Sequence, residues 1–167
     1  MSIVSARFET PLGPVLGAAN HGAIVGLWFE DQRYFPTAAS DWPERPYDAA
    51  LRRLDAWLEA YFAGQSPDPD LPLAPQGTPF RKAVWSLLRQ IPYGCTATYG
   101  GLARLLGAPG RPASARAVGG AVGHNPISLV IPCHRVIGAD GGLTGYAGGL
   151  KRKTALLNLE GARPPSL

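Results

Sequence analysis

Hydrophobic and polar residues alternate at the start of the chain, and the pattern then changes to a helical period. Val4, Ala6 and Phe8 alternate with polar neighbours, which is typical of a half-buried strand. Two more apolar runs, 15–19 and 23–29, are separated by turn sequences, so we predict a small antiparallel meander. Apolar residues then recur at i, i+4 and i+7 over 47–63, which predicts a helix against one face of this sheet.

A proline-rich stretch divides the chain. Residues 66–77 contain four prolines, too many for a helix or a central strand: Pro67, Pro69, Pro72 and Pro75. We therefore predict a linker at about 65–77, which closes a first domain of residues 1–77 and precedes a second domain of residues 78–167.

The second half predicts a series of helices. Thr78 and Pro79 are typical of a helix start, and an apolar stripe continues to Ile91. Further helices are predicted over 99–106, where Thr98 caps, through 115–122, and over 150–159, where Leu156 and Leu159 are expected to be buried. The middle pair resembles a helix-turn-helix, although any two antiparallel helices give the same pattern. The small residues of the third helix allow close approach either to a partner or to another helix of the same protein.

Charge divides the chain at the same place as the prolines. The net charge of +4 combines −5 over residues 1–77 with +9 over residues 78–167. A basic half indicates contact with polyanions or an ordinary solvated surface. The 167 residues are 46% hydrophobic, enough for a core, and no apolar run is long enough to span a membrane. Two cysteines are too few for a disulfide framework or a zinc site, so we expect a cytoplasmic protein without metal.

The candidate chemistry lies in residues 131–136, where Cys133 and His134 follow an apolar run that Pro132 ends. The thiol is either a nucleophile beside its base or a small buried hydrophobe. The glycine-rich loop 138–149 fits no phosphate-binding motif and is expected to line a tight pocket with main chain. Basic residues 151–153 either face an anion or lie exposed, and Glu160 either orients His134 or is solvated.

Several motifs, taken together, resemble the O6-alkylguanine-DNA alkyltransferases of bacterial type. The residues that carry the resemblance are Pro132-Cys133-His134-Arg135-Val136, Arg116-Ala117-Val118-Gly119, Asn125-Pro126, Leu156-Leu157 with Glu160-Gly161, Thr10-Pro11-Leu12-Gly13-Pro14 and Gly26-Leu27-Trp28-Phe29. The resemblance implies a ribonuclease-H-like α/β domain with a small antiparallel sheet and a helix. A mostly helical domain with a winged-helix-like helix-turn-helix would follow it.

The resemblance also implies a catalytic set around one sulfur atom. Cys133 would accept the alkyl group, His134 would take its proton through a water, and Glu160 would hold the imidazole by its other nitrogen. Tyr99 would donate a proton to the base ring, and Asn125 would fix the reactive segment against the third helix. No cofactor is implied, because the product is a thioether that ends the protein's activity after one turnover.

The implied partner is double-stranded DNA that contains O6-alkylguanine, flipped out of the duplex. Arg116 would enter the base stack, and the third helix would lie in the minor groove. The residues implied to contact DNA are Arg116, Tyr99, Ala115, Ala117 and Gly119. The residues implied to form the base pocket are Val136, Tyr146, Ala147 and Gly148. We expect a monomer with no membrane contact, and leave open cooperative binding along DNA and activity on O4-alkylthymine.

One departure and two alternatives accompany the resemblance. Six residues, Gly110 to Ala115, lie between Pro109 and Arg116 where the family usually has three, so the helix-turn-helix connection is longer. A lesion-binding relative without transfer activity is the first alternative, although such relatives typically lack the reactive cysteine. An unrelated thiol hydrolase is the second, and it leaves Arg116 and the basic half unexplained.

Overall fold

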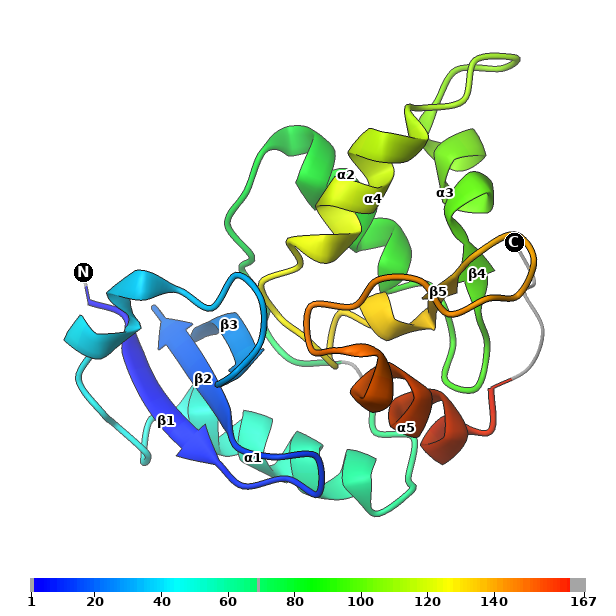
Figure 1. Cartoon of the computed structure of the whole chain (residues 1–167). Coiled ribbons are helices and arrows are strands. Elements are labelled where there is room, and N and C mark those ends of the chain that lie inside the picture. The colour runs from blue at the N-terminus through cyan, green and yellow to red at the C-terminus, as the bar shows by residue number, and fades with distance from the viewer. Residues whose placement is uncertain (1, 69, 163–167) are drawn as a thin grey trace. The chain divides into compact units, whose positions relative to one another are not determined.

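The computed structural model describes residues 2–68 and 70–162 of the chain (Figure 1). Pro69 of the predicted linker and residues 163–167 of the second predicted domain lie outside the described residues. The chain divides into two compact units, one of residues 1–76 with Pro126–Ser128, the other of Gly77–Asn125 with residues 129–167. Each unit is described by itself.

The first unit is built on a three-stranded antiparallel sheet. Its strands, in the order β1-β2-β3, are β1 (Val4–Phe8), β2 (Val15–Asn20) and β3 (Ala23–Phe29). The outer edge of β3 is covered by two short segments. The N–H of Ile24 donates to the Pro72 carbonyl at 2.7 Å, and that of Leu27 to the Pro126 carbonyl at 2.9 Å. These contacts satisfy main-chain groups that an uncovered edge strand would expose.

Helix α1 (Ala49–Phe62) packs on this sheet, and a short 3-10 helix, η1 (Thr37–Asp41), precedes it. The prediction that the helix begins at Tyr47 is wrong: α1 begins at Ala49, and Tyr47 is 86% exposed. The helix begins later because the Asp48 carboxylate accepts the N–H groups of Ala50 and Leu51. A Cβ at Gly17 of β2 would lie 2.9 Å from Leu54, so glycine there allows the helix to approach the sheet closely.

The second unit is mainly helical. Its elements, in chain order, are α2 (Pro79–Leu88), β4 (Ala97–Thr98), α3 (Tyr99–Leu106), α4 (Ala115–Gly123), η2 (Cys133–Arg135), β5 (Val136–Ile137) and α5 (Leu150–Glu160). The hydroxyls of Thr78, Thr98 and Ser114 cap α2, α3 and α4. Trp85 is one of the largest buried side chains of this unit, and its indole N–H donates to the Ala121 carbonyl at 2.8 Å, which joins α2 to α4.

The parallel pair β4–β5 is absent from the predicted elements. Ala97 pairs with Val136 and Thr98 with Ile137. The pair places the start of α3, and therefore Tyr99, beside the segment that follows Cys133.

In α5, the predicted burial of Leu156 is confirmed and that of Leu159 is wrong. Leu156 and Leu157 are buried, whereas Leu159 is only half-buried. Lys153 and Glu160 lie on the same face as these two leucines and are buried with them.

Among the described residues, no helix has the length and apolar character needed to cross a membrane.

Candidate active site

Cys133 is the first residue of η2, a 3-10 helix of one turn. It lies in the segment Pro132–Val136, which we call the cysteine turn. The N–H of Arg135 closes the turn on the Pro132 carbonyl at 3.0 Å. The Asn125 side-chain amide, just beyond α4, donates to the Ile131 carbonyl at 2.7 Å. Asn125 thus holds the residue two positions before Cys133, which is the positioning contact implied by the resemblance.

The Cys133 thiol is enclosed by polar groups but nearly inaccessible, with 6% of the residue exposed. Burial raises the pKa of the thiol. A hydrogen bond from the Asn125 side chain, the charge of Lys153 and the N–H groups of Cys133 and His134 act in the opposite direction without outweighing burial. The thiol is therefore protonated at neutral pH and needs a base before it can act as a nucleophile.

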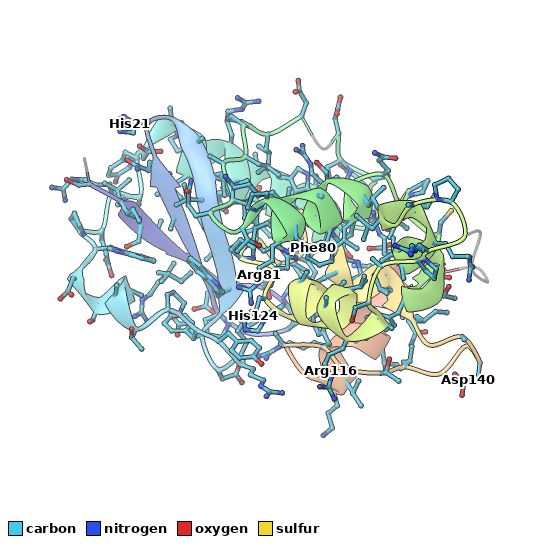
Figure 2. All side chains as sticks on the ribbon, turned by 90° about the horizontal axis from the view of Figure 1, so that it is seen from above. His21, Phe80, Arg81, Arg116, His124 and Asp140 are labelled. Carbon is cyan, nitrogen blue, oxygen red and sulfur yellow. The ribbon has the colours of Figure 1, made fainter. Side chains whose placement is uncertain are left out.

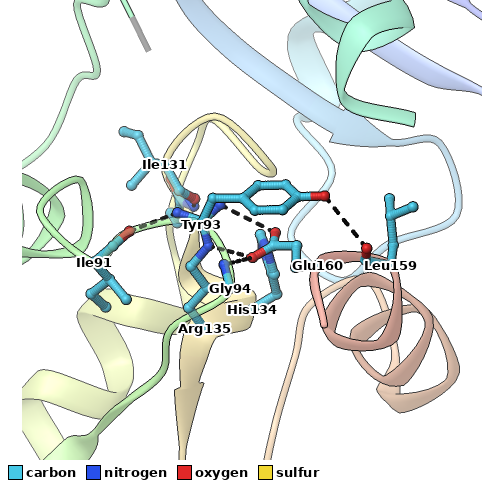
Figure 3. A network of polar contacts seen from close by, with 9 residues as sticks. Ile91, Tyr93, Gly94, Ile131, His134, Arg135, Leu159 and Glu160 are labelled. Carbon is cyan, nitrogen blue, oxygen red and sulfur yellow. Dashed lines mark hydrogen bonds and ion pairs between the residues drawn. The ribbon is translucent and has the colours of Figure 1, made fainter. Parts of the chain in front are cut away.

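His134 and Arg135, the two residues after Cys133, both contact the Glu160 carboxylate from α5 (Figure 3). The His134 Nε2–H group donates to Glu160 Oε2 at 2.6 Å. The Arg135 guanidinium binds both carboxylate oxygens, Nε to Oε1 at 2.8 Å and Nη2 to Oε2 at 3.2 Å. Its Nη1 donates to the Ile91 carbonyl at 2.7 Å, which completes a buried network around one carboxylate.

This network sets the protonation of the imidazole. Burial lowers the pKa of His134, even though the Glu160 carboxylate favours the charged ring. The imidazole is therefore neutral at pH 7, and because Nε2 carries the hydrogen donated to Glu160, Nδ1 is the basic nitrogen. Such a ring is ready to take a proton.

Burial would raise the pKa of the Glu160 carboxyl, but hydrogen bonds and charge from His134 and Arg135 lower it to about 2. Since His134 is neutral at pH 7, Arg135 supplies the counter-charge under those conditions.

The low pKa of Glu160 predicts acid sensitivity. A carboxyl whose pKa is lower folded than unfolded stabilises the protein above its unfolded value of about 4.5, and this stabilisation is lost as pH falls towards 2. We expect urea midpoints to fall steadily below pH 5. Glu160→Gln should flatten that part of the curve, and an unchanged slope in the variant would exclude Glu160 as the cause.

Two tyrosines lie near the sulfur. The Tyr99 hydroxyl, at the start of α3, donates to the Thr144 carbonyl at 3.4 Å. Burial raises its pKa, and Cys133 adds to the rise, so the phenol stays protonated. The Tyr146 ring meets the His134 ring edge to face at 6.5 Å, and its buried hydroxyl has no hydrogen-bond partner among the described residues. Burial also raises the pKa of Tyr146, so both phenols are protonated at neutral pH, that of Tyr99 with its hydrogen directed to Thr144.

Sequence reasoning missed the importance of Lys153. Its side chain is fully buried, and Nζ donates to the carbonyls of Val136 at 2.6 Å, Thr144 at 2.7 Å and Gly145 at 3.2 Å. Burial lowers the pKa of the ammonium to about 8. Lys153 therefore fastens the glycine-rich loop to Val136 at the end of the cysteine turn, and its charge lowers the pKa of the Cys133 thiol.

A usable signal for Lys153 is present in the sequence. Positions 153, 156, 157 and 160 are spaced i, i+3, i+4 and i+7, the period of one buried helix face. Arg135 lies within the motif 132–136, but no role was predicted for it. The sequence does hold a signal, since Asp140 and Glu160 are the only two acids after position 77 that could pair with it.

The outer face of α4 is open. Arg116, Gly119, Gly120 and Gly123 share this face by spacing, and Arg116 projects from it (Figure 2). A Cβ at any of the three glycines would meet nothing within 4 Å. Packing inside the unit therefore does not require small residues here, which favours close approach of an external partner. Ala115 and Ala117 are also exposed.

The remaining predicted pocket residues lie in the loop that Lys153 holds. Gly148 is buried and its carbonyl accepts from Arg152, and Ala147 is half-buried. In residues 2–68 and 70–162, no group of three or more histidine, cysteine or acidic side chains is arranged to bind a metal ion.

Comparison with known proteins identifies the family. Residues 3–75 match the ribonuclease-like domain of 6-O-methylguanine DNA methyltransferase, and residues 79–162 match the DNA-binding domain of the same family. The chain belongs to this methyltransferase family. A relative from Methanosarcina acetivorans, named methylated-DNA–protein-cysteine methyltransferase, is 45% identical over 94% of this chain and 97% of its own. A Mycobacterium bovis methyltransferase of the same name is 46% identical over 95% of this chain and 92% of its own.

Solved structures of the family resemble this chain in fold. The Mycobacterium tuberculosis O6-methylguanine methyltransferase aligns with a TM-score of 0.85 at 42% identity, over 99% of this chain and 96% of that one. A structure of the M. tuberculosis protein in complex with DNA aligns with a TM-score of 0.83. The predicted family and fold class are confirmed, and the comparisons support alkyl transfer from DNA over lesion binding alone.

Proposed function

We propose that this methyltransferase repairs duplex DNA by moving a methyl or larger alkyl group from guanine O6 to Cys133, once per molecule. The observation that carries the proposal is the buried thiol beside a neutral His134 held by Glu160. This arrangement supplies a protected nucleophile, a base and an orienting carboxylate, the set that thiol displacement needs.

The proposed reaction is an in-line displacement. The Cys133 proton passes through a water to His134 Nδ1, and the resulting thiolate attacks the alkyl carbon. The new bond joins Sγ to carbon, the bond from that carbon to O6 breaks, and its electron pair stays on guanine. Tyr99 then protonates the guanine ring. The His134 imidazolium gives up the proton that it took from Cys133, and this proton reaches the Tyr99 phenolate through solvent.

The positioning contacts are proposed to serve this step. Asn125 and the N–H groups of the turn stabilise the thiolate as it forms, because both oppose the effect of burial on the thiol pKa. Lys153 keeps the loop with Tyr146, Ala147 and Gly148 against the cysteine turn, where main-chain groups bind the flipped guanine. Nothing in the site hydrolyses a thioether, so the reaction ends after one equivalent and needs no cofactor.

DNA contact is proposed for the open face of α4. A base inside a duplex cannot reach a buried sulfur, so the nucleotide must be flipped out, at a cost of a few kcal/mol. Arg116 would fill the vacated place in the stack, while Ala115, Ala117 and Gly119 let the helix lie in the minor groove. We assign these contacts to residues 78–167 and a scaffold role to residues 1–77. We also propose that the protein lies in a reducing cytoplasm, which keeps the thiol free.

One experiment tests this proposal. The protein is incubated with duplex DNA that carries radiolabelled O6-methylguanine, and label on protein is counted. We expect one equivalent of label per molecule. Binding without label would indicate lesion recognition alone. The absence of both binding and label would contradict the proposal.

Arg116→Ala should separate base flipping from chemistry. We expect repair of duplex to slow by about 10-fold or more, as the unstacking cost is then uncompensated, whereas reaction with free O6-benzylguanine stays unchanged. Single-turnover rates with both substrates measure this. Equal losses on the two substrates would exclude the role in the stack.

A further inference from the structure

We propose that the turn between α3 and α4, residues Gly107–Ala113, is a second DNA contact in which the Arg111 guanidinium binds a backbone phosphate. The inference rests on the proposed function and extends it to a segment longer than the resemblance predicts. The same turn connects the two predicted DNA-binding helices (Figure 1).

The turn has a defined geometry. The N–H of Arg111 donates to the Ala108 carbonyl at 2.8 Å, and Gly110 between them has a φ of 75°. Proline at the second position and a glycine with positive φ at the third are the residues that a type II turn favours. Arg111 is the fourth residue of this turn, so its backbone is held in place.

The base of the turn is fastened to α3. The Ala103 carbonyl accepts from the N–H of Gly107 at 3.2 Å and from that of Ala113 at 2.8 Å. The chain folds back so closely that a Cβ at Gly107 would lie 2.0 Å from the Arg111 carbonyl oxygen. Because both ends are fixed, Arg111 is carried on a rigid support between two helices, and binding loses little backbone entropy.

The charge around the turn suits a polyanion. The sequence contains no acid between Asp70 and Asp140. Arg104 at the end of α3, Arg111 in the turn and Arg116 in the first turn of α4 are all exposed. Arg111 makes no ion pair or side-chain hydrogen bond with any residue that the structure describes. Its guanidinium is therefore held by no carboxylate of the described residues and is available to an outside anion.

The position of Arg111 favours phosphate over base edges. Arg116 lies on the open face of α4, whereas Arg111 lies off the helix, on the turn that leads into it. Phosphates border a groove that a helix occupies, so a side chain beside that helix meets the backbone. An arginine fork matches the geometry of phosphate oxygens.

The test is the salt dependence of DNA affinity. Each lost phosphate contact lowers the slope of log affinity against log salt by about 0.9. Between about 0.05 and 0.2 M salt, wild-type affinity should therefore fall about 3.5-fold more than that of Arg111→Ala. Arg111→Lys should keep the wild-type slope, because its ammonium still neutralises a phosphate.

A matched control removes the same charge elsewhere. Arg52→Ala on α1 lowers net charge by one from an exposed helix position and should keep the wild-type slope. All variants should react with free O6-benzylguanine at the wild-type rate. An unchanged slope in Arg111→Ala, or an equal drop in Arg52→Ala, would overturn the inference. Failure of wild-type protein to take up the alkyl group would instead overturn the proposed function.

Discussion

Cys133→Ala is expected to abolish alkyl transfer to the protein while leaving affinity for lesion-containing duplex intact. Transfer is lost because the sulfur that forms the new bond to carbon is removed. DNA affinity is retained because the proposed contacts lie on the open face of α4, and the thiol is 6% exposed. Labelled O6-methylguanine duplex measures transfer, and a filter-binding titration at fixed salt measures affinity.

Cys95→Ala is the matched control, since Cys95 is the other free cysteine. It should take up one equivalent at the wild-type rate. Residual labelling of Cys133→Ala would show that a different atom accepts the group.

Glu160→Gln is expected to lower stability by about 3–5 kcal/mol and to slow transfer by about 10²-fold or more. The loss of stability follows because the buried Arg135 guanidinium keeps its position without a counter-charge. The loss of rate follows because an amide can present N–H to the imidazole, which then holds its proton on the wrong nitrogen. Urea denaturation gives the first quantity, and single-turnover transfer to folded protein gives the second.

Glu59→Gln provides the same chemical change on an exposed position of α1 and should alter neither quantity. The transfer assay with free O6-benzylguanine removes DNA binding from the comparison. A wild-type rate in folded Glu160→Gln would exclude the carboxylate from proton movement, whatever happens to stability.

Features governed by neighbouring residues were predictable from the sequence. Helix α3 occupies the predicted residues, and α2 begins where predicted. The hydroxyls of Thr98 and Thr78 cap these helices by accepting an N–H only three residues further on, which is a local signal. The meander was predictable because alternation and turn residues act locally. The start of α1 was missed by two residues, since Asp48 caps the helix and leaves Tyr47 outside it.

Features that depend on distant partners were not predictable. The pairing of β4 with β5 joins two-residue strands far apart in the chain, too short to give a period. Lys153 was interpreted as an anion-facing or exposed residue of a basic run, yet carbonyls of the loop satisfy its ammonium. The link between His134 and Glu160 came from the family resemblance, because the spacing of 26 residues carries no local signal.

The state of the resting thiol is compatible with the reactivity that we propose for Cys133. Burial raises its pKa and excludes solvent, so the thiolate that reacts with oxidants is scarce. The His134 imidazole, which we propose as the base, is neutral and held by Glu160. We therefore expect reaction to depend on entry of a flipped base rather than on general thiol reactivity.

Mass spectrometry of the recovered protein tests the central claim most directly. The protein is incubated with an excess of O6-methylguanine duplex, digested, and the Cys133 and Cys95 peptides are weighed while lesion loss is counted on the same sample. We expect one methyl group on Cys133 for each lesion removed, none on Cys95, and no repair beyond one equivalent. Lesion loss with an unmodified Cys133 peptide, or repair that continues past one equivalent, would contradict it.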